Sequence, residues 1–310
     1  MALGRLVSAF LLTLAGAILA MQMLLHLAPG DPVDLVPGGE QVRSVLEAEW
    51  GLDTPLVARW GRYLARAATG DLGTSLTWRP GAPVAGLVLP ATARSLGLAL
   101  PAVGLALVLG TLLAWATAGR PSRRRRMVQV LSIAPVFLLA FVTVNVLNEA
   151  AWILLERGLI ARPSWFALPD TESGVKTVLA IVVLAVGSGS LAEVHAAVED
   201  EIVRIRNAPF VDAARARGAP LAPHVLRSLV PPLVTLTANR TAFFVGGLVV
   251  IEKILLLNGA GAMLWQACIA RDAPLAMGLA LVAAAVVCAA RLLGDIVRLS
   301  VDPRLREPRP

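Results

Sequence analysis

The sequence predicts an all-α integral membrane protein with six transmembrane helices and both termini in the cytosol. Its 310 residues are 57% hydrophobic and 16% charged, and the mean hydropathy is +0.73. A soluble domain, by contrast, is about half apolar and about a quarter charged. Long uncharged runs recur along the chain, and the basic residues are concentrated between them. These three observations indicate a chain that crosses a membrane several times.

The long apolar runs fix the predicted spans. A span needs about 20 apolar residues, because a helix rises about 1.5 Å per residue and the hydrocarbon core is about 30 Å thick. Six stretches qualify, at 6–27, 93–118, 128–155, 176–196, 233–252 and 276–297. The first follows Arg5, as a signal peptide would, but it exceeds the usual apolar region of about 7–15 residues and lacks a small-residue cleavage site. We therefore predict a membrane helix there.

The basic residues give the orientation, because cytosolic connections retain Lys and Arg. One alternating set of connections holds fifteen positive side chains in about 62 residues, and the other holds ten in about 106. The richer set consists of Arg5, Arg120, Arg123, Arg124, Arg125, Arg126, Arg204, Arg206, Arg215, Arg217, Arg227, Arg298, Arg304, Arg306 and Arg309. We predict that these connections are cytosolic, and they account for most of the net charge of +7.

The spans divide the chain into four predicted segments. They are a first transmembrane helix at 1–27, an extracytoplasmic segment at 28–92, a five-helix core at 93–297 that contains the cytosolic segment 197–232, and a cytosolic tail at 298–310. In the outer segment, apolar residues such as Leu56 and Trp60 alternate with charged ones. This pattern predicts short amphipathic helices that lie on the membrane or pack on the bundle.

The residues present exclude several classes of function. The arginine clusters lie between spans, where topology explains them, so we expect no nucleic-acid partner. Two cysteines, Cys268 and Cys288, are too few for a disulfide framework or a metal cluster. His26, His195 and His224 are scattered at the edges of predicted spans, and the sequence has no nucleophile elbow or Walker phosphate loop. We therefore expect neither enzymatic activity nor a metal or cofactor bound by this chain.

The inner segment predicts a short helix that projects into the cytosol. Pro209 suits the first turn of a helix, and the alanines that follow favour its continuation. Gly218, followed by Pro220, is typical of a helix end. A rigid exposed element of this kind is suited to fit a groove on a soluble partner.

This helix carries a resemblance to a known family. Asp212-Ala213-Ala214, three further residues and Gly218 resemble the E-A-A-x-x-x-G loop of permease subunits of binding-protein-dependent ABC importers, with Asp in place of Glu. The resemblance is to the dipeptide, oligopeptide and nickel branch, whose A-R-A-K-G run is similar to 214–218. Further motifs of that branch occur in order at 28–32, 51–56, 70–75, 89–92, 133–137, 224–228, 232–235 and 302–304. Each motif alone is weak evidence, but all of them in the family's order along six predicted spans are specific to this branch.

The resemblance implies a type I ABC importer permease fold in the bacterial cytoplasmic (inner) membrane. It implies that this chain binds no cofactor, and that ATP and Mg belong to partner ATPase subunits. The implied partners are a second homologous permease subunit, two ATP-binding subunits and an extracytoplasmic solute-binding protein. Peptides are the first expectation for the cargo, with nickel, opines and other small solutes left open. The residues implied to couple to the ATPase are Asp212, Ala213, Ala214, Arg215, Arg217 and Gly218.

Charged residues within the predicted spans are candidates for the translocation path, because a charge at the centre of a membrane helix costs about 2.5–3.5 kcal/mol on insertion scales. Arg291 has Asp295 four residues later, which could instead neutralise it locally. Arg240 occupies a position that is often Gln in the family, and no acidic residue lies at helical spacing from it. It is shallow enough in its span for partial snorkelling.

Two further groups are predicted on the outer side. Glu252 is expected at the interface with solvent, and with Gly259 and Gly261 it is a candidate gate, since glycines permit a tight re-entrant turn. Arg271 and Asp272 are expected to form a surface pair that helps to dock an external partner.

Two other classes of protein remain as alternatives. A secondary transporter or another membrane protein that works without an ATPase would share the hydropathy profile. A secondary transporter usually shows inverted repeats or broken spans in matching positions, and the sequence gives no convincing sign of either.

Overall fold

The computed structural model describes residues 2–27, 54–118, 134–160, 174–187, 189–218, 220 and 222–301. Helices dominate these residues, and the β contact among them is one isolated bridge between Thr74 and Pro83. Several predictions lie on residues outside this set. They are the first part of the outer segment, at 28–53, the arginine run at 123–126, the start of the predicted span 128–155, and the tail beyond residue 301.

Among the described residues, three unbroken helices are long and apolar enough to cross a membrane. They are α4 (Val84–Thr117), α6 (Val136–Glu156) and α12 (Ala273–Val301). The N-terminal helix α1 (Ala2–Leu27) adds the shorter apolar stretch Val7–Met21. The described part of the chain is therefore helical, and the chain is a multi-pass membrane protein.

Two more candidate spans are bent helices. α7 (Gly174–Val186) and α8 (Ser190–Arg206) meet at 48°, and α10 (Ala222–Ile254) bends by 54° between Ser228–Thr241 and Val245–Ile254. If each bent pair is one span, the described residues hold up to five crossings, apart from the stretch in α1.

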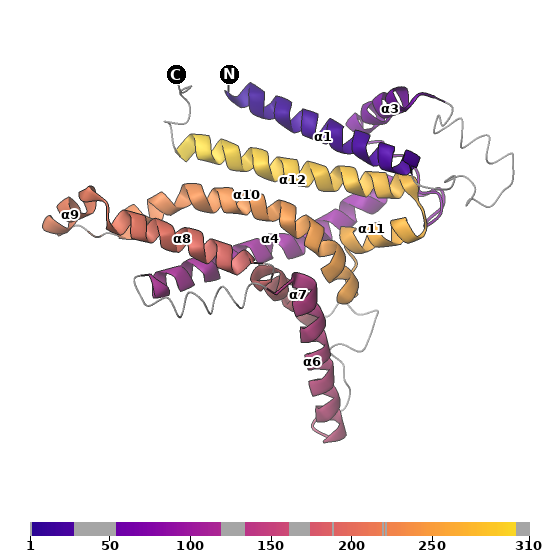
Figure 1. The fold of residues 1–310 in the computed structure, drawn as a ribbon. Coiled ribbons are helices and arrows are strands. Elements are labelled where there is room, and N and C mark those ends of the chain that lie inside the picture. Colours follow the sequence, from indigo (N-terminus) through magenta and orange to yellow (C-terminus); the bar gives the residue numbers. More distant parts are fainter. Residues whose placement is uncertain are drawn as a thin grey trace. The chain divides into compact units, whose positions relative to one another are not determined.

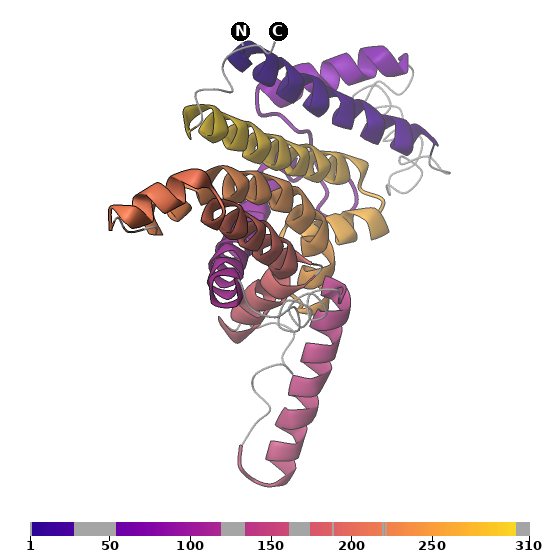
Figure 2. The ribbon, with the colours of Figure 1, turned by 60° about the vertical axis from the view of Figure 1, so that its left-hand side comes forward.

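The chain forms two compact units, and the first consists of Met1–Leu96 and Asn258–Leu292. In it, α3 (Leu56–Ala68) lies beside α1 (Figures 1 and 2). The indole Nε1 of Trp60 donates a hydrogen bond to the carbonyl of Ala15 at 3.1 Å. The amphipathic helix predicted around Trp60 thus packs on a helix of the bundle.

The core of the first unit joins the start of α4 to α11 (Ala260–Ile269) and α12. Its buried side chains are Leu72, Val84, Val88, Ala267, Leu275, Ala276 and Leu279. Gly278 of α12 makes the contact possible, because a Cβ there would lie 2.5 Å from Cγ1 of Val84. Val84 and Val88 are one turn apart on α4, and both are buried in this core. This packing extends the helix, and α4 begins nine residues before the predicted span at 93.

The second unit consists of Gly97–Leu257 and Leu293–Pro310. Here α8 runs along α10 (Figures 1 and 2), and both pack on the second half of α4 through Ala114, Val194, Val198, Ile202, Ile205, Leu229 and Leu236. A second cluster joins α4, α6, α7 and α10 around Val136, Leu184 and Ile251. Beyond Val136 and Ala140, α6 buries none of its side chains in this unit and exposes Phe141, Val146 and Trp152. Such an apolar surface suits lipid or another subunit.

Candidate functional site

The predicted cytosolic helix is present as α9 (Pro209–Ala216), which follows α8 directly (Figure 1). The amide of Ala208 donates to the carbonyl of Ile205, and the amide of Val211 donates to the carbonyl of Ala208, both at 2.9 Å. Pro209 occupies the first helical position, where its missing N–H is not needed. Gly218 has φ +68, a left-handed conformation that favours glycine. The predicted start and end of the helix are confirmed.

One side of α9 is anchored and the other is open. Val211 is fully buried in the cluster of Ile205 and Leu229. Asp212, Ala213, Arg217 and Gly218, four of the six predicted coupling residues, are exposed, while the side chains of Ala214 and Arg215 lie outside the described set. The helix is therefore held from within the unit and presents a polar surface outward.

A buried polar contact ties α8, which carries α9, to α4. The hydroxyl of Thr117 donates to the carbonyl of Leu113 at 2.8 Å, which leaves its oxygen to accept from Nε2–H of His195 at 2.8 Å. Nδ1 of His195 lies 4.0 Å from a carboxylate oxygen of Glu199. All three side chains are buried. Sequence reasoning treated His195 as an isolated histidine because its partner Thr117 is 78 positions away.

The structure gives Arg240 an acidic partner on another helix. Its guanidinium forms an ion pair with Glu193 of α8, and its Nη1 lies 3.3 Å from the hydroxyl of Ser190. Helical spacing in the sequence does not predict this pairing, because Glu193 lies on α8 and helical spacing relates only residues of one helix. The signal was available, since Glu193 is an acid inside a predicted span.

Asp295 neutralises a different arginine from the one predicted. Its carboxylate lies 3.8 Å from Nη1 of Arg298, three residues later. Arg291 is exposed and has no acidic partner among the described residues. The structure therefore does not support the alternative in which Asp295 neutralises the charge of Arg291.

The expected solvent position of Glu252 is wrong, because its side chain is fully buried beside Ile251 and Leu255. α10 continues to Ile254 and carries Glu252 with it. The expected glycine turn also differs. Leu256 adopts the left-handed conformation with φ +54, whereas Gly259 is extended as the N-cap of α11 and Gly261 is buried within that helix. A bulky residue in the left-handed region costs of order 1–3 kcal/mol.

The expected surface position of Asp272 is also wrong. This residue is 1% exposed, and its Oδ2 accepts hydrogen bonds from the hydroxyl of Ser75 and from the backbone amides of Leu76, Thr77 and Trp78, at 2.5–3.1 Å. Its Oδ1 accepts from the amide of Leu275 at 3.2 Å, and so caps α12. Arg271 is exposed beside it, with φ +51.

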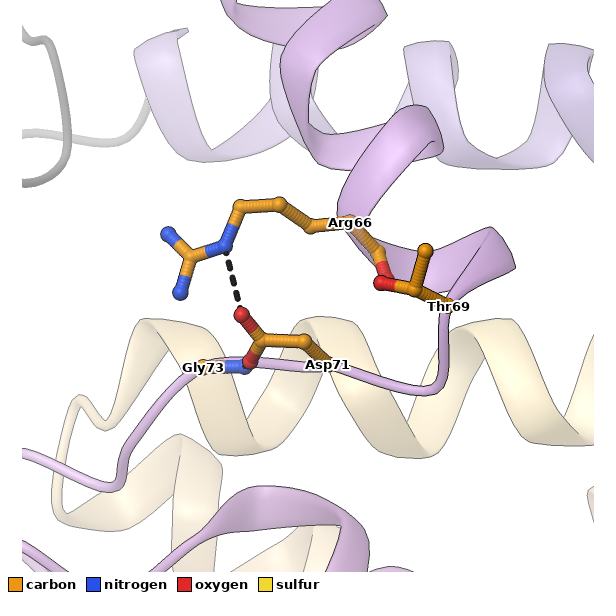
Figure 3. A network of polar contacts seen from close by, with 4 residues as sticks. All are labelled: Arg66, Thr69, Asp71 and Gly73. Carbon is orange, nitrogen blue, oxygen red and sulfur yellow. Dashed lines mark hydrogen bonds and ion pairs between the residues drawn. The ribbon is translucent and has the colours of Figure 1, made fainter.

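A second aspartate, Asp71, holds the turn that precedes the segment bound by Asp272 (Figure 3). Oδ2 of Asp71 accepts from Nε of Arg66 at 2.9 Å, and Oδ1 accepts from the amide of Gly73 at 2.9 Å. The hydrogen bond from Arg66 and then that from Gly73 hold the pKa of Asp71 below its usual value. Thr69 closes the turn by donating to the carbonyl of Arg66 at 2.7 Å. The 70–75 motif is thus a folded turn, with φ +83 at Gly70 and +84 at Gly73.

Comparison with known proteins agrees with the resemblance in the sequence. Residues 106–307 match the family described as binding-protein-dependent transport system inner membrane component. A Brucella ovis protein described as a peptide permease is 30% identical, over 92% of both chains. The oligopeptide transport system permease protein AppB of Bacillus subtilis is 25% identical over 94% of this chain and 95% of its own. The glutathione transport system permease protein GsiC of Escherichia coli is 25% identical over 92% of both.

Proposed function

Because the chain belongs to the family of inner membrane components of binding-protein-dependent transport systems, we propose that it couples ATPase movement to solute import through α9. The family is one of permease subunits, which work with ATPase and solute-binding subunits and are not enzymes themselves. The residues that we assign to the contact with the ATPase are Asp212, Ala213, Ala214, Arg215, Arg217 and Gly218.

The observation that supports this role is the way α9 is mounted. Val211 is fully buried while Asp212 and Arg217 beside it are exposed, so a force on the polar side is passed to the core rather than absorbed by a loop. From there it reaches α8, and the contact of His195 with Thr117 passes it to α4. Rigid-body movement of packed helices is a common route for such coupling.

The remaining parts of the proposal follow from the family and the sequence. The proposal includes six spans, with both termini in the cytosol of a bacterium and the chain in its inner membrane. A second homologous permease completes the path, and each permease contacts one of two ATP-binding subunits, which hold ATP and Mg. An external solute-binding protein delivers the cargo. Peptides are the proposed class, because the relatives named above are permeases for peptides and for glutathione.

Charge reversal on α9 tests the coupling role. Asp212→Lys is compared with Asp200→Lys, which makes the same change at an exposed acid of α8, outside α9. We expect Asp212→Lys to lower ATP-dependent uptake of labelled tri-alanine or glutathione at least about tenfold, the effect of losing about 1.4 kcal/mol at a contact. The ATPase should also co-purify less well with this variant, whereas Asp200→Lys should behave as the wild type.

The proposal fails if Asp212→Lys and Asp200→Lys both retain wild-type uptake and ATPase binding. The alternative, a transporter that needs no ATPase, makes a different prediction. In that case the purified chain alone, reconstituted in liposomes, would accumulate solute along an ion gradient without ATP.

A further inference from the structure

The bends of the two broken spans in the second unit meet at one polar cluster. The chain bends between α7 and α8 immediately before Ser190, and α10 bends immediately after Thr241. Arg240 reaches across from α10 to the hydroxyl of Ser190 at 3.3 Å and forms an ion pair with Glu193. We call Ser190, Glu193 and Arg240 the charged node.

The bend beside the charged node is fixed by two glycines. Gly189 has φ +79, and a Cβ at Gly187 would lie 2.8 Å from the carbonyl of Val183 and 3.1 Å from Cα of Val136. Both contacts are to backbone, which cannot move aside. A broken helix is tolerated at membrane depth where it is buried in protein or lines a water-filled cavity. We therefore expect this break to face protein or water rather than lipid.

The exposure of the ion pair supports the same conclusion. The Arg240 side chain is 14% exposed, whereas that of Glu193 is 46% exposed. Val194 and His195, the next residues of α8, are buried. Glu193 therefore lies at the edge of the unit and presents its carboxylate outward. Ionisable groups at membrane depth avoid lipid and face a bundle interior or a watery cavity.

The depth of the charged node is consistent with a place inside the membrane. α7 has 13 residues and is therefore about 20 Å long, and Val245–Ile254 is about 15 Å long. α7 begins at the predicted outer surface and Val245–Ile254 ends there, so the two bends lie between the midplane and the inner half of a core about 30 Å thick.

We propose that the charged node lines the water-filled translocation path and that the Glu193 carboxylate accepts hydrogen bonds from ammonium groups of the passing solute. This inference rests on the proposed permease function. Arg240, whose Nη1 donates to the hydroxyl of Ser190, holds the Glu193 carboxylate in place. Because the ion pair is neutral overall, it guides a cationic group without trapping it. Passage requires binding that is favourable enough for entry and weak enough for release.

Thiol accessibility tests the position of Glu193. The experiment uses the whole complex in inverted vesicles, with Cys268 and Cys288 replaced by alanine and Glu193→Cys introduced. The probe is a membrane-impermeant cationic methanethiosulfonate, applied without nucleotide and again after trapping with ATP and vanadate. Leu112→Cys is the matched control. Leu112 is 62% exposed on an apolar stripe of α4, and it is close to the depth of Val194, which approaches Gly110 of that helix.

A path position predicts that the thiol at 193 reacts without nucleotide and reacts at least about tenfold more slowly in the trapped state, in which the inner mouth closes. The thiol at 112 should stay unreactive in both states. Equal reactivity at 193 in both states would place Glu193 at the cytosolic interface and overturn the proposal. No reactivity in either state would place it against lipid or a partner subunit, and would overturn the proposal as well.

Exchanging the two charges tests whether Glu193 contacts the solute or only holds α8 and α10 together. This test does not depend on the cysteine variant. Glu193→Arg combined with Arg240→Glu keeps the ion pair but moves the carboxylate to α10. We expect normal protein levels and normal ATPase binding, but at least a fivefold loss of tri-alanine uptake. Full recovery of uptake would show a clamp only and overturn the proposal. If the wild-type complex transports neither tri-alanine nor glutathione, the peptide assignment fails, whereas the labelling result still decides the path position.

Discussion

A single buried carboxylate organises the loop at residues 75–78. Asp272 receives four hydrogen bonds at one oxygen, three of them from consecutive backbone amides. Hydrogen bonds to charged groups contribute about 1.5–3 kcal/mol each. Asp71, in the same loop region, accepts one hydrogen bond at each oxygen, but its side chain is 51% exposed, so water can replace its partners.

These two aspartates give a matched prediction. Asp272→Asn replaces a fourfold acceptor by an amide that is neutral and brings its own donors to face the loop, so the apparent melting temperature of the purified protein should fall by at least about 3 °C. Asp71→Asn is the same chemical change at an exposed site and should shift it little. Tryptophan fluorescence during heating measures both. Equal shifts of the melting temperature in the two variants would show that the burial of Asp272 does not strengthen its hydrogen bonds, which would contradict the prediction.

At the scale of the element, the contact of α4 with α8 depends on one glycine. A Cβ at Gly110 would lie 2.5 Å from Cγ1 of Val194 and 3.2 Å from the backbone nitrogen of His195. Gly104, less than two turns earlier on α4, has no atom within 4 Å of the same position. The two glycines therefore differ in packing but not in secondary structure.

Alanine at these two positions should have effects of opposite sign. Gly110→Ala overpacks the contact, which costs about 1–3 kcal/mol, and pushes α8 and the attached α9 away from α4. Gly104→Ala gains helix propensity of about 0.8–1 kcal/mol without a clash. The apparent melting temperature should fall for Gly110→Ala and rise for Gly104→Ala. ATP-dependent uptake should fall for the first variant and be maintained for the second. A loss in both variants would mean that α4 needs glycine for its own flexibility.

The elements that sequence predicted well are those with local causes. Pro209 and Gly218 act within a few residues, so the limits of α9 could be read directly. The start of α4 could not, because Val84 becomes helical through packing on Gly278 in a distant helix. The burial of Glu252 and Asp272 and the pairing of Arg240 with Glu193 likewise depend on chain segments that are far apart in sequence.

For the whole molecule, the charge distribution makes a prediction about topology. The described helices account for up to five crossings and α1 supplies a further apolar stretch, while the basic residues favour cytosolic termini. A green fluorescent protein fused after Pro310 should fluoresce, and alkaline phosphatase fused there should be inactive. Fusions after Gly158, between α6 and α7, should show the reverse pattern. An active phosphatase at the C-terminus would contradict an even number of spans.

The anchoring of this loop by Asp272 also bears on how its sequence can evolve. Three of the donors are main-chain amides, at residues 76, 77 and 78, and every amino acid except proline supplies that group. The carboxylate thus sets the path of the backbone with little regard to the side chains that the loop displays. The side chains of residues 76–78 can therefore change during evolution while the backbone of the loop keeps its shape, provided that Asp272 and Ser75 are kept together.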